Sequence, residues 1–293
     1  MNVSQRKKPL KEQIEPYLYL LPSLIIFSLF VFYPFLKTIY MSLTLTDAHG
    51  QIREFIGFEN YITLAKSAEF RNSILTSIKF VFLIAFPTII ISLILALLGN
   101  EKVKGSRITT IMFSLPMAVS SASASIIWML LFHPSIGFIN YILGTNIGWL
   151  VDARWALFAV TAVTVWMNLG INFIFIIAGL KNIPSDLIES AEIDGANYMK
   201  RLFHIILPGL SPTLFFVIVI NIINSFQAFG QVNIMTKGGP GQSTNVMVFS
   251  IYRDAFFNNR FGIASAQSIV LFILMLAVTL IQFKYEKKKV FYK

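Results

Sequence analysis

Six long apolar runs constrain the fold of this chain more than any other feature. Each has about 20 residues or more, the length that an α-helix needs to cross roughly 30 Å of hydrocarbon. They are approximately Tyr17–Tyr40, Ile74–Leu98, Ile108–Phe132, Trp155–Leu180, Leu210–Phe229 and Ile263–Phe283. Because the runs are continuous and not alternating, we expect helices, which satisfy their own backbone polar groups, and not barrel strands. The sequence predicts an all-α membrane protein with six transmembrane helices, kinked where Pro34, Pro87 and Pro116 interrupt the runs.

Composition narrows the function classes. Charged residues make up 13% of the 293-residue chain, against roughly 25% in soluble domains. A net charge of +10 could indicate nucleic-acid binding, but a membrane protein with basic cytoplasmic segments accounts for it, so no nucleic-acid partner is expected. The chain has no cysteine and three scattered histidines, which predicts no metal site and no thiol chemistry.

The distribution of basic residues predicts the orientation. Of 24 Lys and Arg residues, fifteen lie on one side of the predicted spans and seven on the other, with Lys37 and Lys79 inside spans near their ends. The positive-inside rule puts the richer side, with both termini, in the cytoplasm. The expected divisions are a tail (1–16), a first span (17–42), an extracytoplasmic loop with an amphipathic helix near residues 60–68 (43–73), a core (74–283) with a cytoplasmic loop (181–212), and a basic tail (284–293).

Two other classes of membrane protein lack the residues they need. None of the fourteen carboxylates falls inside a predicted span, which argues against a proton-driven carrier but leaves sodium coupling open. No paired acids or catalytic cluster supports an intramembrane enzyme. The segment Thr236–Thr244, TKGGPGQST, lacks the P-loop spacing and lies on the outer side, so it predicts a tight turn before a short helix.

The cytoplasmic loop contains the polar stretch ESAEIDGANYMKRLFHIILPGLSP. We expect a short helix capped by Ser185, a left-handed residue at Gly195, and a second helix over Asn197–Ile206 that stops ahead of Pro208. An amphipathic helix on lipid headgroups is the alternative. The first helix is acidic, whereas a membrane-surface helix prefers a basic polar face, so the pattern favours a protein partner.

This pattern resembles the EAA signature of bacterial ABC importer permeases, with Ser190 in place of the usual alanine. The resemblance implies that the two short helices are coupling helices that dock on a cytoplasmic ATPase. Its matching positions are Glu189, Ala191, Asp194, Gly195, Ala196 and Pro208. In the implied roles, Glu189 anchors the docked helix and Gly195 permits the bend.

Phrases along nearly the whole chain, such as GFENYITL, LFHPSIG, IPSDLIESAEIDGA and ASAQSIVLF, resemble the carbohydrate-type, maltose-permease-F-like family. SLTLTDAHGQ and the C-terminal segment are most similar to A-type permease subunits for sn-glycerol-3-phosphate uptake. The resemblance implies a type I ABC importer permease with five core helices plus one N-terminal helix, in the bacterial cell (inner) membrane. Its solute would be sn-glycerol-3-phosphate or a related diester, with a sugar or oligosaccharide as the alternative and a secondary carrier or intramembrane enzyme less favoured.

The same resemblance implies three partners: a second, homologous permease, a homodimeric ATPase and an extracytoplasmic solute-binding protein. ATP and Mg²⁺ would be held by the ATPase, with no cofactor and no enzymatic activity on this chain.

Solute contacts are expected from polar side chains inside the spans. Asn168 and Asn172 share one helix face, as do Asn221, Asn224 and Gln227. Buried amides need partners, which a hydroxyl-rich solute would provide, although hydrogen bonds between helices are the alternative. Lys79 is the embedded cation that could meet an anionic solute, with snorkelling to the membrane surface as the other interpretation.

Overall fold

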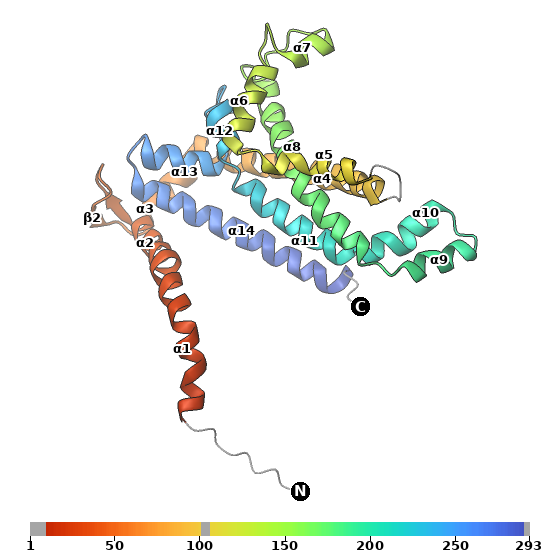
Figure 1. Ribbon diagram of the computed structural model, residues 1–293. Helices are drawn as coiled ribbons and strands as arrows, with labels where there is room; N and C mark the ends of the chain where they lie inside the picture. The colour runs from red at the N-terminus through yellow and green to blue at the C-terminus, as the bar shows by residue number, and fades with distance from the viewer. Residues whose placement is uncertain (1–9, 101–105, 290–293) are drawn as a thin grey trace.

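The computed structural model describes residues 10–100 and 106–289, which are mostly helical and include one short pair of strands (Figure 1). The ends of the two predicted tails, 1–9 and 290–293, lie outside this part. Helix α1 (Leu10–Phe27) already begins within the predicted N-terminal tail, and α14 (Phe261–Lys289) continues into the predicted C-terminal one. Both terminal spans are therefore helices that extend past their apolar runs.

The first span is continuous through its proline. After α1, a π-helical turn, η1 (Ser28–Phe32), leads into α2 (Tyr33–Ser42). The backbone N–H of Tyr33 donates to the carbonyl of Ser28, five residues back. This wider turn precedes Pro34, which lacks an N–H of its own. Helix α1 projects away from the bundle in Figure 1, whereas α2 packs on α14 through Phe35 and Phe272, whose ring centroids are 5.1 Å apart.

A small ordered unit follows the first span. Strands β1 (Thr44–Thr46) and β2 (Ile52–Phe55) pair antiparallel, and α3 (Glu59–Lys66) matches the predicted amphipathic helix. Asn60 joins the two parts, since its Nδ2 donates to the carbonyls of Ser42 (2.9 Å) and Thr44 (3.1 Å). The strands were not predicted from the sequence, because each is too short for its alternation to be recognised.

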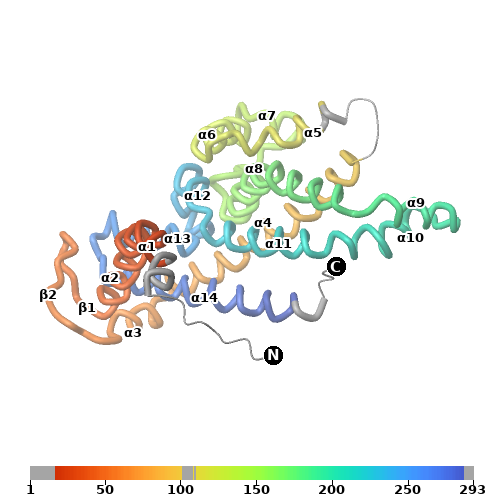
Figure 2. Tube along the Cα trace, turned by 60° about the horizontal axis from the view of Figure 1, so that its bottom comes forward, coloured from red at the N-terminus to blue at the C-terminus, as the bar shows by residue number. Residues whose placement is uncertain are grey.

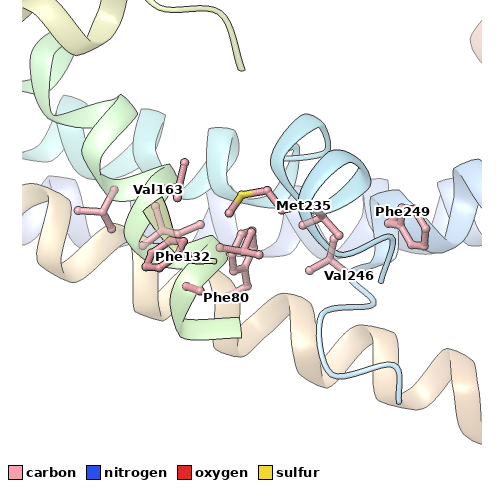
Figure 3. Close-up of a cluster of buried hydrophobic side chains, with 11 residues drawn as sticks. Phe80, Phe132, Val163, Met235, Val246 and Phe249 are labelled. Carbon is pink, nitrogen blue, oxygen red and sulfur yellow. The ribbon is translucent and has the colours of Figure 1, made fainter. Parts of the chain in front are cut away.

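The bundle core is built on α4 (Ala68–Asn100) and α8 (Ala153–Lys181), with α11 (Leu207–Phe226) and α14 beside them (Figure 2). Helix α4 continues through Pro87 without interruption. A buried cluster that includes Phe80, Val163 and Phe249 joins α4, α8 and α13 (Met247–Phe256) (Figure 3). Helix α8 extends from this cluster to the loop that was predicted to be cytoplasmic, so it links the two ends of the molecule.

The third predicted span, Ile108–Phe132, is not one straight helix. It divides into α5 (Ser106–Ser114), a 3-10 turn η2 (Leu115–Ala118) and α6 (Ser121–Leu131), with a bend of 104° between Thr110–Ala118 and Ser121–Leu131. Pro116 lies in the 3-10 turn, and Ser120 caps the new helix by accepting from the N–H of Ser123 at 3.1 Å. The described residues therefore contain five helices that could span a membrane, or six if this bent pair is one crossing.

Short elements close the end of the bundle that lies away from α9 and α10 (Figure 1). They are α7 (Phe138–Leu143), α12 (Gly230–Met235) and α13. Between α12 and α13, Gly238 and Gly241 adopt φ of 79° and 55°, and the Thr236 and Thr244 hydroxyls lie 2.8 Å apart. The predicted tight turn before a short helix is confirmed.

Candidate functional site

The loop between α8 and α11 carries two helices at one end of the molecule (Figures 1 and 2): α9 (Ser185–Ile193) and α10 (Tyr198–Arg201). We call Ser185–Arg201 the α9–α10 segment. Pro184, and not Ser185, occupies the N-cap of α9, and no side chain caps this end. The Ser185 hydroxyl instead bonds the Asp186 carboxylate at 3.3 Å, because it already lies inside the first turn. The predicted Ser185 cap is wrong.

Gly195 makes the bend between the two helices. Its φ is +76°, and the N–H groups of Gly195 and Ala196 donate to the carbonyls of Glu192 (3.0 Å) and Ala191 (2.9 Å). This pair of bonds closes a helix end in the Schellman arrangement, in which glycine adopts the left-handed conformation without strain. The predicted left-handed Gly195 is confirmed. A Cβ at this position would meet no atom within 4 Å, so a side chain would be opposed by backbone strain and not by a clash.

The second helix begins as predicted but does not stop where predicted. The Asn197 side chain accepts from the N–H of Lys200 at 2.9 Å, which confirms the expected cap. After α10, a π-helical stretch, η3 (Leu202–Ile206), runs directly into α11, whose second residue is Pro208. The N–H of Leu207 donates to Leu202, five residues back. The wider turn lets the helix accommodate the proline, as it does at Pro34, so the predicted stop before Pro208 is wrong.

Charges in the α9–α10 segment divide into paired and unpaired groups. Arg201 and Glu192 form an ion pair that ties α10 to α9. Glu189 and Asp194 are exposed, and their carboxylates have no hydrogen bond or ion pair within the described part of the chain. Their charges therefore remain available to another molecule.

The segment also exposes apolar side chains that the sequence reasoning missed. Ile193 is 87% exposed and Met199 60%, and Phe203, just after the segment in η3, is 61% exposed. A cleft of about 640 Å³ lies beside them, and its lining includes Ala191, Asp194 and Pro208. A second cleft, of about 590 Å³, is lined in part by Glu189 and Arg201. The sequence signal that could have predicted this exposed surface is the presence of apolar residues within an otherwise polar loop.

Inside the bundle, two of the predicted solute-contacting amides bind each other. Asn172 of α8 and Asn221 of α11 are 3% and 2% exposed, and each donates from its Nδ2 to the Oδ1 of the other. Asn172 also donates to the carbonyl of Asn168 at 2.7 Å, and Asn221 to that of Val217 at 2.8 Å. The hydrogen bonds between helices that were the alternative interpretation are therefore present at this pair.

The other three amides lie farther from the α9–α10 segment. Asn168 is one turn before Asn172 on α8 and half-buried. Asn224 follows Asn221 on α11, Gln227 is the C-cap of that helix, and both are exposed. Gln231, which was not predicted, is 7% exposed and donates to the Met167 sulfur at 3.1 Å. Polar groups thus continue beyond the buried pair along both helices.

Lys79 is the remaining residue that was predicted to contact the solute. It lines a cleft of about 600 Å³ between α4 and the start of α8, together with Arg154 and Asn72. Its meeting with an anionic solute stays a prediction, as do the roles of the residues in the α9–α10 segment. In the described residues, no group of three or more His, Asp or Glu side chains could hold a metal ion.

Comparison with known proteins shows which family has this sequence and architecture. The family model described as "Binding-protein-dependent transport system inner membrane component" matches residues 88–290. A relative from Agrobacterium fabrum, the sn-glycerol-3-phosphate transport system permease protein UgpA, is 35% identical over 284 residues, which are 96% of this chain and 97% of the relative. The protein of the same name from Pectobacterium atrosepticum is 36% identical over 282 residues, 95% of this chain and 96% of its own.

Solved structures agree on the fold. A chain of a bacterial ABC transporter involved in the import of the acidic polysaccharide alginate superposes with a TM-score of 0.83 at 24% identity, over 96% of this chain and 98% of the other. A chain of the MetNI methionine ABC transporter gives 0.58 at 15% identity, over 80% and 99%. The predicted type I ABC permease fold is confirmed, and the chain is a multi-pass, membrane-embedded transport permease. It belongs to the family of binding-protein-dependent transport system inner membrane components.

Proposed function

We propose that this permease imports sn-glycerol-3-phosphate or a closely related glycerophosphodiester. The observation that carries the proposal is the agreement of relatives named for sn-glycerol-3-phosphate transport, at 35–36% identity over 95–96% of the chain. A sugar or oligosaccharide is the second candidate, because the chain with a TM-score of 0.83 belongs to an alginate importer.

The proposed arrangement has six crossings with both termini in the cytoplasm. The bent α5–η2–α6 unit counts as the third crossing, and the excess of basic residues on the side of the α9–α10 segment supports the orientation. In this orientation the β1–β2 unit, α7 and the turn before α13 face the outside, where a solute-binding protein would deliver its cargo.

The α9–α10 segment is proposed to dock on a homodimeric ATPase, which would hold the ATP and Mg²⁺. Three properties support this role: the unpaired Glu189 and Asp194, the exposed Ile193, and the fixed bend at Gly195. Exposed apolar side chains on a bundle end that faces water mark a surface for a protein partner. The Glu189 carboxylate would make a charge-assisted hydrogen bond on docking.

A second, homologous permease would complete the pathway. In the most apolar 18-residue window of the first span, Tyr17–Ser42, no residue is buried in the isolated chain, which is consistent with a partner or lipid around it. Asn168, Asn224 and Gln227 would face the solute, one to two turns outward of the buried amide pair. As the segment moves with the ATPase, α8 and α11 would transmit that movement to these side chains.

Uptake by the purified complex in proteoliposomes tests the proposal. Complexes of this chain with its partner permease, ATPase and binding protein should take up radiolabelled sn-glycerol-3-phosphate when ATP is supplied to the ATPase side. Excess unlabelled glycerophosphodiester should compete, whereas maltose should not. Competition by the sugar alone, or accumulation without ATP, would contradict the proposal.

A further inference from the structure

A cleft near the outer end of α4 and α8 combines cationic and apolar groups on a surface that faces away from the core. Around Lys79, the exposed stripe of α4 is otherwise apolar: Leu75 is 57% exposed, Phe82 56% and Phe86 60%. Ile90 and Ile94 continue it at the same helical spacing. Such an apolar stripe is compatible with the hydrocarbon of a bilayer, and Lys79 is its one charged position over these five neighbours.

The cleft has a polar mouth. Its lining includes Lys79, Arg154 and Ser243, together with the amide of Asn72. Arg154 uses its Nε and Nη2 to bind Asp152, with Nη2 at 2.7 Å from Oδ2, so its Nη1 still points to no described partner. The hydroxyl of Ser243 is buried and has no hydrogen-bond partner among the described residues. Two donors near a cation are thus unsatisfied.

The charge and shape of the cleft indicate its ligand. Lys79 and Arg154 carry two positive charges and Asp152 one negative charge, which leaves one positive charge at the mouth. A phosphodiester carries one negative charge, and donors from cationic side chains bind its oxygens well. The walls are apolar, with Phe82 and Phe158 lining the same cleft, 56% and 52% exposed. Acyl chains would lie against these rings and the stripe below them.

We propose that this cleft binds an anionic phospholipid of the outer leaflet, with its phosphodiester between Lys79 and Arg154. Lys79 snorkels toward the headgroup level to reach it. The outer-leaflet location rests on the orientation proposed above, whereas lipid binding itself depends on neither the orientation nor the solute. The free glycerophosphate solute shares the phosphate chemistry but lacks the acyl chains that the apolar walls would accommodate.

Native mass spectrometry of the purified complex tests the assignment, with phosphatidylglycerol and phosphatidylcholine as probes. Wild-type complex should retain phosphatidylglycerol preferentially. Lys79→Gln should weaken that binding about fivefold, the effect of one lysine at an anionic lipid surface, and Lys79→Arg should preserve it. Lys37→Gln is the matched control, since Lys37 is also an exposed lysine within a span but does not line the cleft. The Lys37→Gln complex should bind phosphatidylglycerol as the wild type does.

Three results would overturn the assignment. They are equal retention of both lipids by the wild type, unchanged phosphatidylglycerol binding in Lys79→Gln, and displacement of the lipid by free sn-glycerol-3-phosphate with a raised KM for uptake in that variant. The last would make the cleft a solute site. Failure of sn-glycerol-3-phosphate uptake in the wild type would reject the proposed substrate without affecting the lipid result.

Discussion

Asn172 and Asn221 lie buried between α8 and α11 and satisfy each other, whereas Glu189 and Asp194, in the segment that joins the same helices, lie exposed and unpaired within the described residues. A buried amide in an apolar bundle must find a partner inside the chain. An exposed carboxylate at the end of the bundle is solvated by water and can bind a group of another molecule. Polar side chains therefore serve packing between α8 and α11, whereas those of the α9–α10 segment remain available to another molecule.

Replacing Gly195 tests the docking region most severely. Gly195→Val places a β-branched residue at φ +76°, where L-residues cost about 1–2 kcal/mol, and should lower uptake about tenfold or more by changing the angle between α9 and α10. Gly195→Asn is the control, because asparagine tolerates this conformation, and should keep most activity. Membrane levels of both variants are measured by blotting. Wild-type uptake by the valine variant would contradict a fixed bend.

The amide pair predicts the opposite behaviour, an effect on stability. Asn172→Leu alone leaves the buried Oδ1 of Asn221 without its donor and should destabilise the subunit by about 1–3 kcal/mol. The double variant Asn172→Leu/Asn221→Leu removes both polar groups and should recover much of that loss. Thermal unfolding of the purified complex measures the cycle. Additive losses in the double variant would show that the two amides act separately.

Asn224 should affect the solute more than the fold. Because its side chain is exposed in the chain, Asn224→Ala should leave thermal stability unchanged while raising the KM for uptake about fivefold, the effect of one lost hydrogen bond of about 1 kcal/mol. Asn233→Ala, a half-buried amide of α12, serves as the matched control. An unchanged KM with lowered stability would assign Asn224 to packing instead.

The smallest expected effect is a pH dependence in the β1–β2 turn. Backbone hydrogen bonds to Asp47, chiefly from the N–H of Gln51 at 2.8 Å, hold the pKa of this carboxyl below its usual value. A lowered folded-state pKa means that the ionised form stabilises the turn above the usual pKa of aspartate, and that this stabilisation is lost as pH falls through the lowered value. The protection factor of the Gln51 amide, the intrinsic exchange rate divided by the observed rate at the same pH, should therefore fall at acidic pH.

Asp47→Asn separates charge from hydrogen bonding in that turn. The asparagine oxygen can still accept from the Gln51 N–H, so the protection factor of this amide should become nearly independent of pH. Retained pH dependence of the protection factor in Asp47→Asn would assign the effect to another titratable group.

Sequence patterns predicted the parts of the fold that depend on long apolar periods. The helices α4, α8, α11 and α14, the bend at Gly195 and the Asn197 cap all follow from local chemistry. A kink at Pro116 was also predicted, but its size of 104° was not. The continuation through Pro208 was not predicted either, because a proline can either break a helix or be accommodated by a wider turn. Tertiary packing decides between the two.

The candidate sites likewise divide into those that a local sequence pattern predicts and those that depend on tertiary packing. The α9–α10 segment was recognised because its polar residues interrupt an apolar chain. The pairing of Asn172 with Asn221 depends on how α8 and α11 face each other, 49 residues apart in sequence, and no local pattern determines that. The exposure of Ile193 was likewise not predicted, because an isoleucine on a short helix is expected to pack against the protein.

Site-directed labelling of Ile193 tests most directly the claim that the α9–α10 segment is a cytoplasmic docking surface. The chain has no cysteine, so Ile193→Cys would supply one reactive thiol in it, at a position 87% exposed. A membrane-impermeant maleimide should label it in inverted vesicles and not in intact cells or spheroplasts, and the assembled ATPase should protect it. Labelling from outside the cell, or no protection by the ATPase, would contradict the account.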